Sequence, residues 1–237
     1  MRWHARRLSE GARAALDRPP VADDGPGVER TLVVGLDPLR ILLFGSGPLI
    51  GYGVRARKDA VDGPLAELLA DATGRGVIVE SRLRLGLPMA DAVASLGGAG
   101  TTTFAVAVWA PRFGEELRHS DTERCRTSIR AMLQQFRTHS PIPLIVCHLP
   151  EPLGHDWRTM LRRPRVARFN RILSEEAASA SGVTAVAIGS YRPTDPRSTP
   201  APWHRGVAER LVPAVLRAIG APGRPVRALL ADGGDRS

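Results

Sequence analysis

The sequence predicts a three-layer α/β/α domain built around a five-stranded parallel sheet. Two observations predict this class. Five short apolar runs recur along the chain, and segments with helical periodicity separate them. Continuous apolar runs are typical of strands that are buried on both faces. Strands that alternate with helices form parallel sheets with right-handed crossovers.

The predicted strands are these apolar runs. They are Ile41–Phe44, Val77–Val79, Phe104–Trp109, Pro143–Cys147 and Val183–Ile188.

The predicted helices lie between and after the strands. The first opens at Asp62, which we place as its N-cap with Pro64 just inside, and it ends near Gly74. A long amphipathic helix from Asp121 to Thr138 carries its apolar residues on one side. The remaining helices are expected at about 90–96, 165–180 and 203–219.

The chain of 237 residues, 43% of them hydrophobic, is long enough for one sizeable core. We expect an N-terminal helix and linker over residues 1–30, the helix at 8–17 and the Pro-, Gly- and Asp-rich linker at 18–30. The folded domain is expected over residues 31–220. The Gly- and Arg-rich residues 221–237 are expected to form a flexible tail.

The formal charge is +9, and Lys58 is the only lysine. The arginines are scattered and aromatic residues make up only 5% of the chain. Nucleic-acid binders instead gather basic residues on one face, with aromatic residues among them. We therefore expect no nucleic-acid partner, although the charge permits weak attraction to anionic surfaces.

No apolar run approaches the ~18 residues of a membrane span, and the basic N-terminus has no apolar segment after it. We therefore expect a cytoplasmic protein without a membrane span. Cys125 and Cys147 fall on different predicted elements and match no metal or redox spacing. The histidines and acidic residues show no ligand spacing either, so we expect no metal and no cofactor.

A site is expected at the carboxyl ends of the strands, where ligands bind in open α/β sheets. The segments that follow the strands are 46–53, 84–88, 110–114, 148–155 and 190–198.

The first of these segments permits a nucleotide-binding hypothesis. Gly45, Gly47 and Gly51 follow the first strand, as glycines do in dinucleotide-binding loops. Such a loop opens directly into a helix, whereas here the helix signals begin at Asp62. The acidic residue at the end of the second strand, Glu80, lies farther along the chain than the motif places it.

The run Arg40–Val54 fits a different pattern better. It reads RILLFGSGPLIGYGV and resembles the first block of the SGNH (GDSL-type) hydrolases, in which a strand ends in Gly-Asp-Ser and a Gly-x-Gly-Val follows. The resemblance extends over residues 39–216 and includes later segments in the family's order. These are Arg84–Gly86, Ala90–Ala92, Leu149–Gly154, Phe169–Leu173 and Ala208–Leu211. It implies a flavodoxin-like fold of the SGNH type and a relation to carboxylic ester hydrolases.

The resemblance also implies a catalytic site, and this chain departs from it at three of the four positions that carry Ser, Gly, Asn and His in the family. The nucleophilic serine falls on Gly47, the oxyanion-binding asparagine on Pro111 and the catalytic histidine on Ser198. The oxyanion-binding glycine is kept as Gly86 and the orienting acid as Asp195. Glycine has no nucleophile, proline offers no hydrogen-bond donor, and serine is no base near neutral pH.

Two residues are candidate substitutes for the missing groups. Ser46 lies one residue before the nucleophile position, and His148 ends the fourth strand at the same sheet edge. His204 falls inside the last helix, about two turns beyond the histidine position. A remaining ligand pocket would be formed by Ser46, Gly47, Gly86, Trp109, Arg112 and Asp195, with Arg112 as the group that holds a carboxylate or phosphate. The alternative, which the sequence favours, places Trp109 in the core and Arg112 in solvent.

The sequence thus favours a catalytically degenerate SGNH-like protein that binds a small acyl ligand or a protein partner. One alternative is an active, divergent acyl or acetyl esterase or acyltransferase that uses Ser46 or an unrecognised triad. The second alternative is the nucleotide-binding protein.

Overall fold

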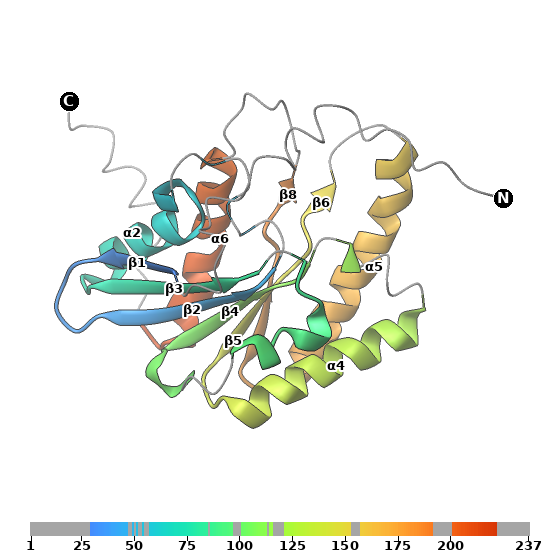
Figure 1. Ribbon diagram of the computed structural model, residues 1–237, viewed down its shortest axis with the longest axis horizontal. Coiled ribbons are helices and arrows are strands. Elements are labelled where there is room, and N and C mark those ends of the chain that lie inside the picture. Colours follow the sequence, from blue (N-terminus) through green and yellow to red (C-terminus); the bar gives the residue numbers. More distant parts are fainter. Residues whose placement is uncertain are drawn as a thin grey trace.

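The computed structural model (Figure 1) describes the predicted domain but not its two ends. The described residues are 29–46, 49, 51, 54, 57–84, 86–96, 101–112, 114, 115, 121–152, 157–191 and 201–221. The predicted helix at 8–17 and the predicted tail lie outside them.

A six-stranded sheet forms the centre of the domain, in the order β1-β3-β2-β4-β5-β7. All neighbours from β3 to β7 are parallel, so the predicted five-stranded parallel sheet is confirmed. The strands are β1 (Glu29–Val33), β2 (Leu39–Gly45), β3 (Val77–Leu83), β4 (Val106–Ala110), β5 (Leu144–Cys147) and β7 (Val183–Val186).

The edge strand β1 was not predicted. It pairs with β3 in the antiparallel direction, and it begins at Glu29, within the predicted linker. A second, two-stranded sheet joins β6 (Glu151–Pro152) and β8 (Ser190–Tyr191) beyond the ends of β5 and β7.

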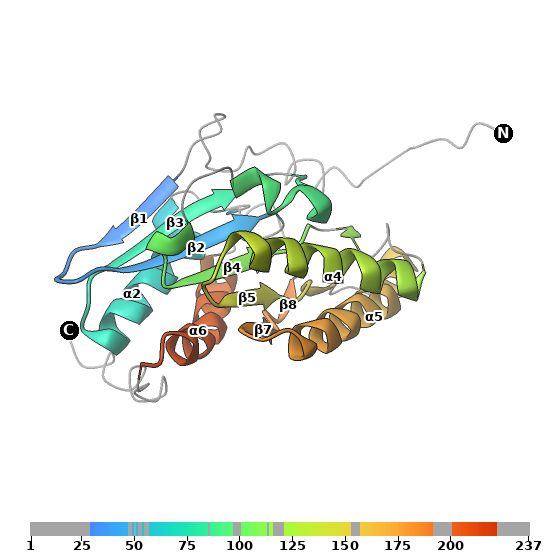
Figure 2. The same ribbon diagram turned by 90° about the horizontal axis from the view of Figure 1, so that it is seen from below.

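Helices cover both faces of the main sheet (Figure 2). On one face lie α2 (Asp62–Thr73) and α6 (Ala201–Ala218), which pack against each other. On the other lie α4 (Thr122–His139) and α5 (Trp157–Ser179), together with three short 3₁₀ turns between residues 89 and 103. No helix among the described residues is both long enough and apolar enough to cross a membrane.

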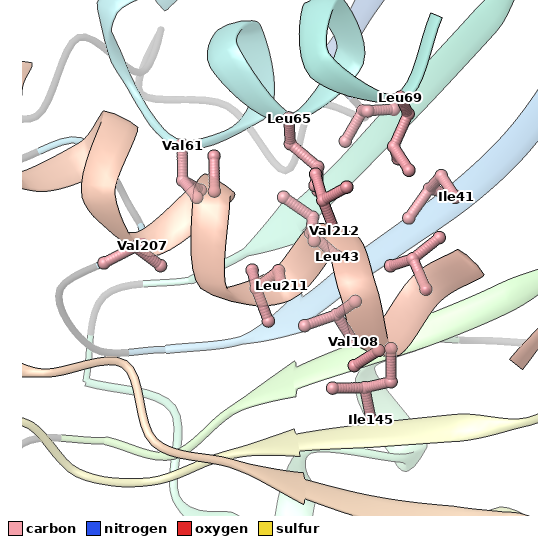
Figure 3. Packing of buried hydrophobic residues seen from close by; sticks show 14 of the residues in the cluster. Ile41, Leu43, Val61, Leu65, Leu69, Val108, Ile145, Val207, Leu211 and Val212 are labelled. Carbon is pink, nitrogen blue, oxygen red and sulfur yellow. The ribbon is translucent and has the colours of Figure 1, made fainter. Parts of the chain in front are cut away.

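Successive side chains of each central strand point to opposite faces of the sheet, as the two-residue period of a strand requires. Ile41 and Leu43 of β2 pack beneath α2 and α6 together with Leu65 and Leu211, as Figure 3 shows. On the opposite face Phe44 stacks on Phe136 of α4, with ring centroids 5.6 Å apart. The sheet is therefore a fully buried layer, which explains why its strands are continuous apolar runs.

The helices follow the sequence signals with three exceptions. Helix α4 begins next to the predicted start at Asp121, which is its N-cap, and the Asp121 carboxylate accepts the backbone N–H groups of Glu123 and Arg124. Asp62, however, is not the cap of α2, because that position is Val61. Asp62 is instead fully buried and accepts a hydrogen bond of 2.8 Å from the hydroxyl of Thr31 in β1.

The second exception is α5, which begins at Trp157, well before the predicted residue 165. It runs through Pro164, although proline lacks the N–H that an interior helical position donates. The predicted helix at 90–96 is two separate 3₁₀ turns, Met89–Asp91 and Ala94–Leu96.

Candidate functional site at the carboxyl edge of the sheet

Three chain segments meet at the carboxyl end of β2. The backbone N–H of Ser46 donates to the carbonyl oxygen of Ala110 at 2.8 Å, and the N–H of Arg84 donates to the carbonyl of Gly45 at 2.9 Å. These bonds join the ends of β2, β3 and β4. The segments that carry the first three blocks of the resemblance therefore lie together, as the sequence predicted.

Gly45 has a φ of +104°, a conformation that disfavours any residue with a side chain. A β-carbon at this position would overlap the carbonyl oxygen of Ala110 and lie 2.9 Å from Cδ1 of Trp109. The last residue of β2 is thus packed directly against the indole of Trp109, which requires a glycine at residue 45.

Trp109 and Ser46 are both interior residues. Trp109 is 1% exposed and belongs to the core cluster beneath α4, and Ser46 is 2% exposed. Neither side chain presents a surface to a ligand in this conformation. Trp109 therefore fills the space below the turn, and the burial of Ser46 disfavours it as a nucleophile.

The second and third blocks contribute Gly86, Pro111 and Arg112. Gly86 has a φ of +72°, and a β-carbon there would meet no atom within 4 Å. Pro111 is buried directly after β4, while Arg112 is half-buried. The sequence resemblance aligns Pro111 with the family's oxyanion-binding asparagine, and the proline ring has no N–H donor.

The remaining predicted site residues, Gly47, Asp195 and Ser198, lie outside the described residues. Their predicted places at the site stay predictions.

His148, the candidate base, is engaged with α5. It follows β5, and its Nε2 lies 2.8 Å from the hydroxyl oxygen of Ser174. Burial lowers the pKa of His148 below its ordinary value. This lowered pKa favours the neutral imidazole, and its hydrogen bond joins the end of β5 to α5.

A second side-chain contact between α5 and the end of β5 lies one helical turn before Ser174. The side chain of Asn170 accepts the N–H of Leu149 and donates to the carbonyl of Leu149, both at 2.8 Å. Asn170 lies in the segment Phe169–Leu173 that resembles the family, but its contact with Leu149 was not predicted. The spacing of Asn170 and Ser174, four residues apart on one helix, was the available signal.

His204 lies inside α6, as the sequence indicated, and it is 1% exposed. Its ring packs edge-on against Trp203, with centroids 5.1 Å apart, and the indole N–H of Trp203 donates to the carbonyl of Ser190 at 2.8 Å. The hydrogen bond from Trp203 to Ser190 attaches α6 to β8.

Glu80 is the acidic residue of the nucleotide-binding hypothesis. It is fully buried and forms ion pairs with arginines. Its carboxylate accepts hydrogen bonds from Arg30 at 3.1 Å and from Arg82 at 2.9 and 2.6 Å, and Arg40 lies 3.6 Å away. Such a carboxylate is not presented to a ribose hydroxyl. This arrangement disfavours the nucleotide-binding alternative.

A groove of about 440 Å³ lies between the 3₁₀ turn Met89–Asp91 and α4. Its lining includes Pro88, Glu115, Arg124 and Met132, but none of the residues predicted for the ligand pocket. Glu115 is buried and accepts the backbone N–H of Met89 at 3.3 Å. Among the residues that the structure describes, no three His, Cys, Asp or Glu side chains gather as metal ligands would.

Comparison with solved structures relates this architecture to known proteins. A catalytic mutant of Axe2, an acetylxylan esterase from Geobacillus stearothermophilus, matches with a TM-score of 0.54 and 14% identity, over 81% of this chain and 99% of its own. A member of the lipolytic G-D-S-L family from Veillonella parvula matches with a TM-score of 0.58 and 12% identity, over 76% of this chain and 99% of its own. The fold is that of the SGNH hydrolases.

TesA shares this SGNH fold, with a TM-score of 0.54 and 16% identity over 76% of this chain and 99% of its own. No protein-family model matches the sequence, and no curated protein matches it. At these identities the likeness concerns the SGNH fold, which confirms the architecture that the sequence resemblance implied.

Proposed function

We propose that this protein is an SGNH-fold binding module that lacks the ester-hydrolase mechanism of the fold. Pro111 is the observation that carries the proposal. It is buried directly after β4, at the place of the family's asparagine, and offers neither a side-chain donor nor an N–H. A preorganised donor at this place stabilises the tetrahedral intermediate, and loss of one such donor costs ~10²–10³ in turnover.

The burial of Ser46 supports the same proposal. With 2% of its surface exposed and its backbone bonded to Ala110, Ser46 cannot reach an acyl carbonyl without rearrangement of the turn after β2. The sequence places Gly47 at the family's nucleophile position, and glycine has no attacking group. An acyl-transfer reaction would thus lack both an attacking group and a complete oxyanion site.

For the ligand we propose a small acyl compound or a protein partner that meets the carboxyl edge of the sheet. The half-buried Arg112 is the cation there that suits a carboxylate or phosphate. For the location we propose the cytoplasm, where the free, buried thiols of Cys125 and Cys147 stay reduced.

Hydrolysis of a short-chain nitrophenyl ester tests the proposal. We expect the wild-type protein to give no more turnover than the Ser46→Ala variant. Turnover that is lost in Ser46→Ala would show an active, divergent esterase and would contradict the proposal.

A restored variant serves as the positive control for the scaffold. Gly47→Ser combined with Ser198→His returns a hydroxyl and an imidazole to the family's positions. We expect weak activity from it, because Pro111 still leaves the oxyanion site without a donor. Adding Pro111→Asn should then raise turnover further, by ~10-fold or more.

A further inference from the structure

The amino-terminal part of α5 differs from the other described helices in the side chains that it exposes. Met160 and Leu161 are 62% and 56% exposed, next to each other on the first turns of the helix. Pro164 and Ala167 are also exposed, four and seven residues after Met160. This spacing places Met160, Pro164 and Ala167 on one line along the helix, so an apolar stripe faces solvent.

Arginines surround this stripe. Residues 157–171 contain six arginines and no acidic residue. Arg163 and Arg165 are exposed on either side of the stripe, and Arg168 is half-buried one turn later. We call the exposed group the α5 surface, which consists of Met160, Leu161, Arg163, Pro164, Arg165 and Ala167.

The charge of α5 changes along its length. At its carboxyl end Glu175 and Glu176 bind Arg126 of α4, both at 2.7 Å, and they secure the helix to the domain. Arg171 pairs with Glu175 at 3.3 Å, but the preceding residues 157–170 carry five arginines and no acidic residue. The positive charge of α5 is therefore concentrated where the apolar stripe is exposed.

The position of this surface follows from the topology. Because α5 comes after β5, it starts at the carboxyl edge of the sheet, the edge of the candidate site, and Figure 1 shows this end of α5 extending past the strands. The α5 surface thus lies on the part of α5 that extends past the strands of the main sheet.

We propose that the α5 surface binds the surface of an anionic phospholipid membrane. Exposed apolar side chains bordered by arginines match the interfacial region of a bilayer, which accepts both. Met160 and Leu161 would enter the acyl boundary while the arginines remain among the negatively charged headgroups. A nucleic acid would use the arginines but would leave the apolar stripe unused.

Sedimentation with phospholipid vesicles tests this proposal. The full chain is mixed with vesicles of phosphatidylcholine alone or of phosphatidylcholine with phosphatidylglycerol. We expect binding to the mixed vesicles only, and weaker binding as salt is raised. Equal binding to both vesicles, or to neither, would overturn the proposal.

Two double variants separate the apolar and the basic contributions. Met160→Ser with Leu161→Ser should weaken binding by about tenfold, since two apolar side chains no longer insert. Arg163→Gln with Arg165→Gln should weaken it by a similar or larger factor, because one arginine near an anionic surface contributes about fivefold. Both variants alter exposed side chains, and circular dichroism checks that the fold is kept.

The matched control removes two exposed arginines elsewhere, Arg137→Gln of α4 with Arg217→Gln of α6. It changes the net charge by the same amount and should leave vesicle binding within about twofold of wild type. If this control weakens binding as much as Arg163→Gln with Arg165→Gln, the attraction is a property of the net charge and the proposal fails. If the Met160–Leu161 variant binds like wild type and duplex DNA displaces the vesicles, the surface recognises polyanions instead.

Discussion

The backbone of Gly45 lies against the indole of Trp109, so closely that a β-carbon at residue 45 would be 2.9 Å from Cδ1 of the ring. This contact fixes the turn that leads from β2 into the candidate site. It also explains how a tryptophan at the end of β4 is accommodated in the core rather than in a pocket.

Gly45→Ala should therefore destabilise the protein by at least ~2 kcal/mol. The substitution combines a strained φ of +104° with overlap against Ala110 and Trp109. Urea unfolding followed by tryptophan fluorescence or circular dichroism measures the free energy of unfolding.

Gly86→Ala is the matched control for this prediction. Its φ of +72° carries backbone strain, but a β-carbon there would meet no atom within 4 Å. We expect the free energy of unfolding to fall by only about 1 kcal/mol. If the two variants lose the same free energy of unfolding, the contact with Trp109 does not constrain the end of β2.

The buried carboxylate of Glu80 should be a major determinant of stability at the β1 edge. Glu80→Gln leaves Arg82, whose side chain is 15% exposed, without its anionic partner. We expect a loss of about 3 kcal/mol in the free energy of unfolding. The control is Arg30→Gln, because Arg30 is 63% exposed and its bond to Glu80 is open to solvent, and it should cost less than about 1 kcal/mol. A near-neutral Glu80→Gln variant would contradict this account.

Acid sensitivity is expected from the bridge between α4 and α5. Burial raises the pKa of the Glu176 carboxyl, but hydrogen bonds from Arg126 and Arg130 outweigh it and hold this pKa below its ordinary value. A carboxyl with a lowered pKa in the folded state stabilises the protein above its unfolded pKa of about 4.3, and this contribution is lost as the pH falls further. The free energy of unfolding should therefore be lower at about pH 3.5 than at pH 7, because the contribution of Glu176 is reduced.

Glu176→Gln tests the assignment of this pH dependence. The variant should be about 2 kcal/mol less stable at pH 7 and should lose less stability on acidification than the wild type. The control is Glu123→Gln, since Glu123 is 77% exposed and 3.8 Å from Arg126. An acid profile that Glu176→Gln leaves unchanged would place the titrating groups elsewhere.

The sequence was sufficient for the parallel part of the sheet because those strands are buried on both faces. Runs such as Ile41–Phe44 have no polar position, and no other element fits them. The edge strand β1 escaped prediction for the opposite reason. Its residues Arg30 and Thr31 are polar, and they bind side chains far along the chain, Glu80 for Arg30 and Asp62 for Thr31.

The incorrect assignment of Asp62 has the same origin. An acidic residue before Gly-Pro has the local signature of an N-cap, and only the position of Thr31 in space shows that its carboxylate serves β1 instead. Tertiary packing also determines how deeply two candidate site residues are buried. The sequence placed Trp109 and Ser46 at the correct edge of the sheet, and it favoured a core position for Trp109, which the structure shows. It contained no comparable signal for the depth at which Ser46 is buried.

Labelling with an alkyl fluorophosphonate, followed by intact-mass spectrometry, tests the absence of a catalytic serine most directly. Such a reagent modifies a serine only where a neighbouring base activates its hydroxyl. We predict that the mass of the folded protein remains unchanged after prolonged exposure. A stoichiometric adduct that maps to Ser46, or to any other serine, and disappears when that residue is replaced by alanine would contradict the proposal.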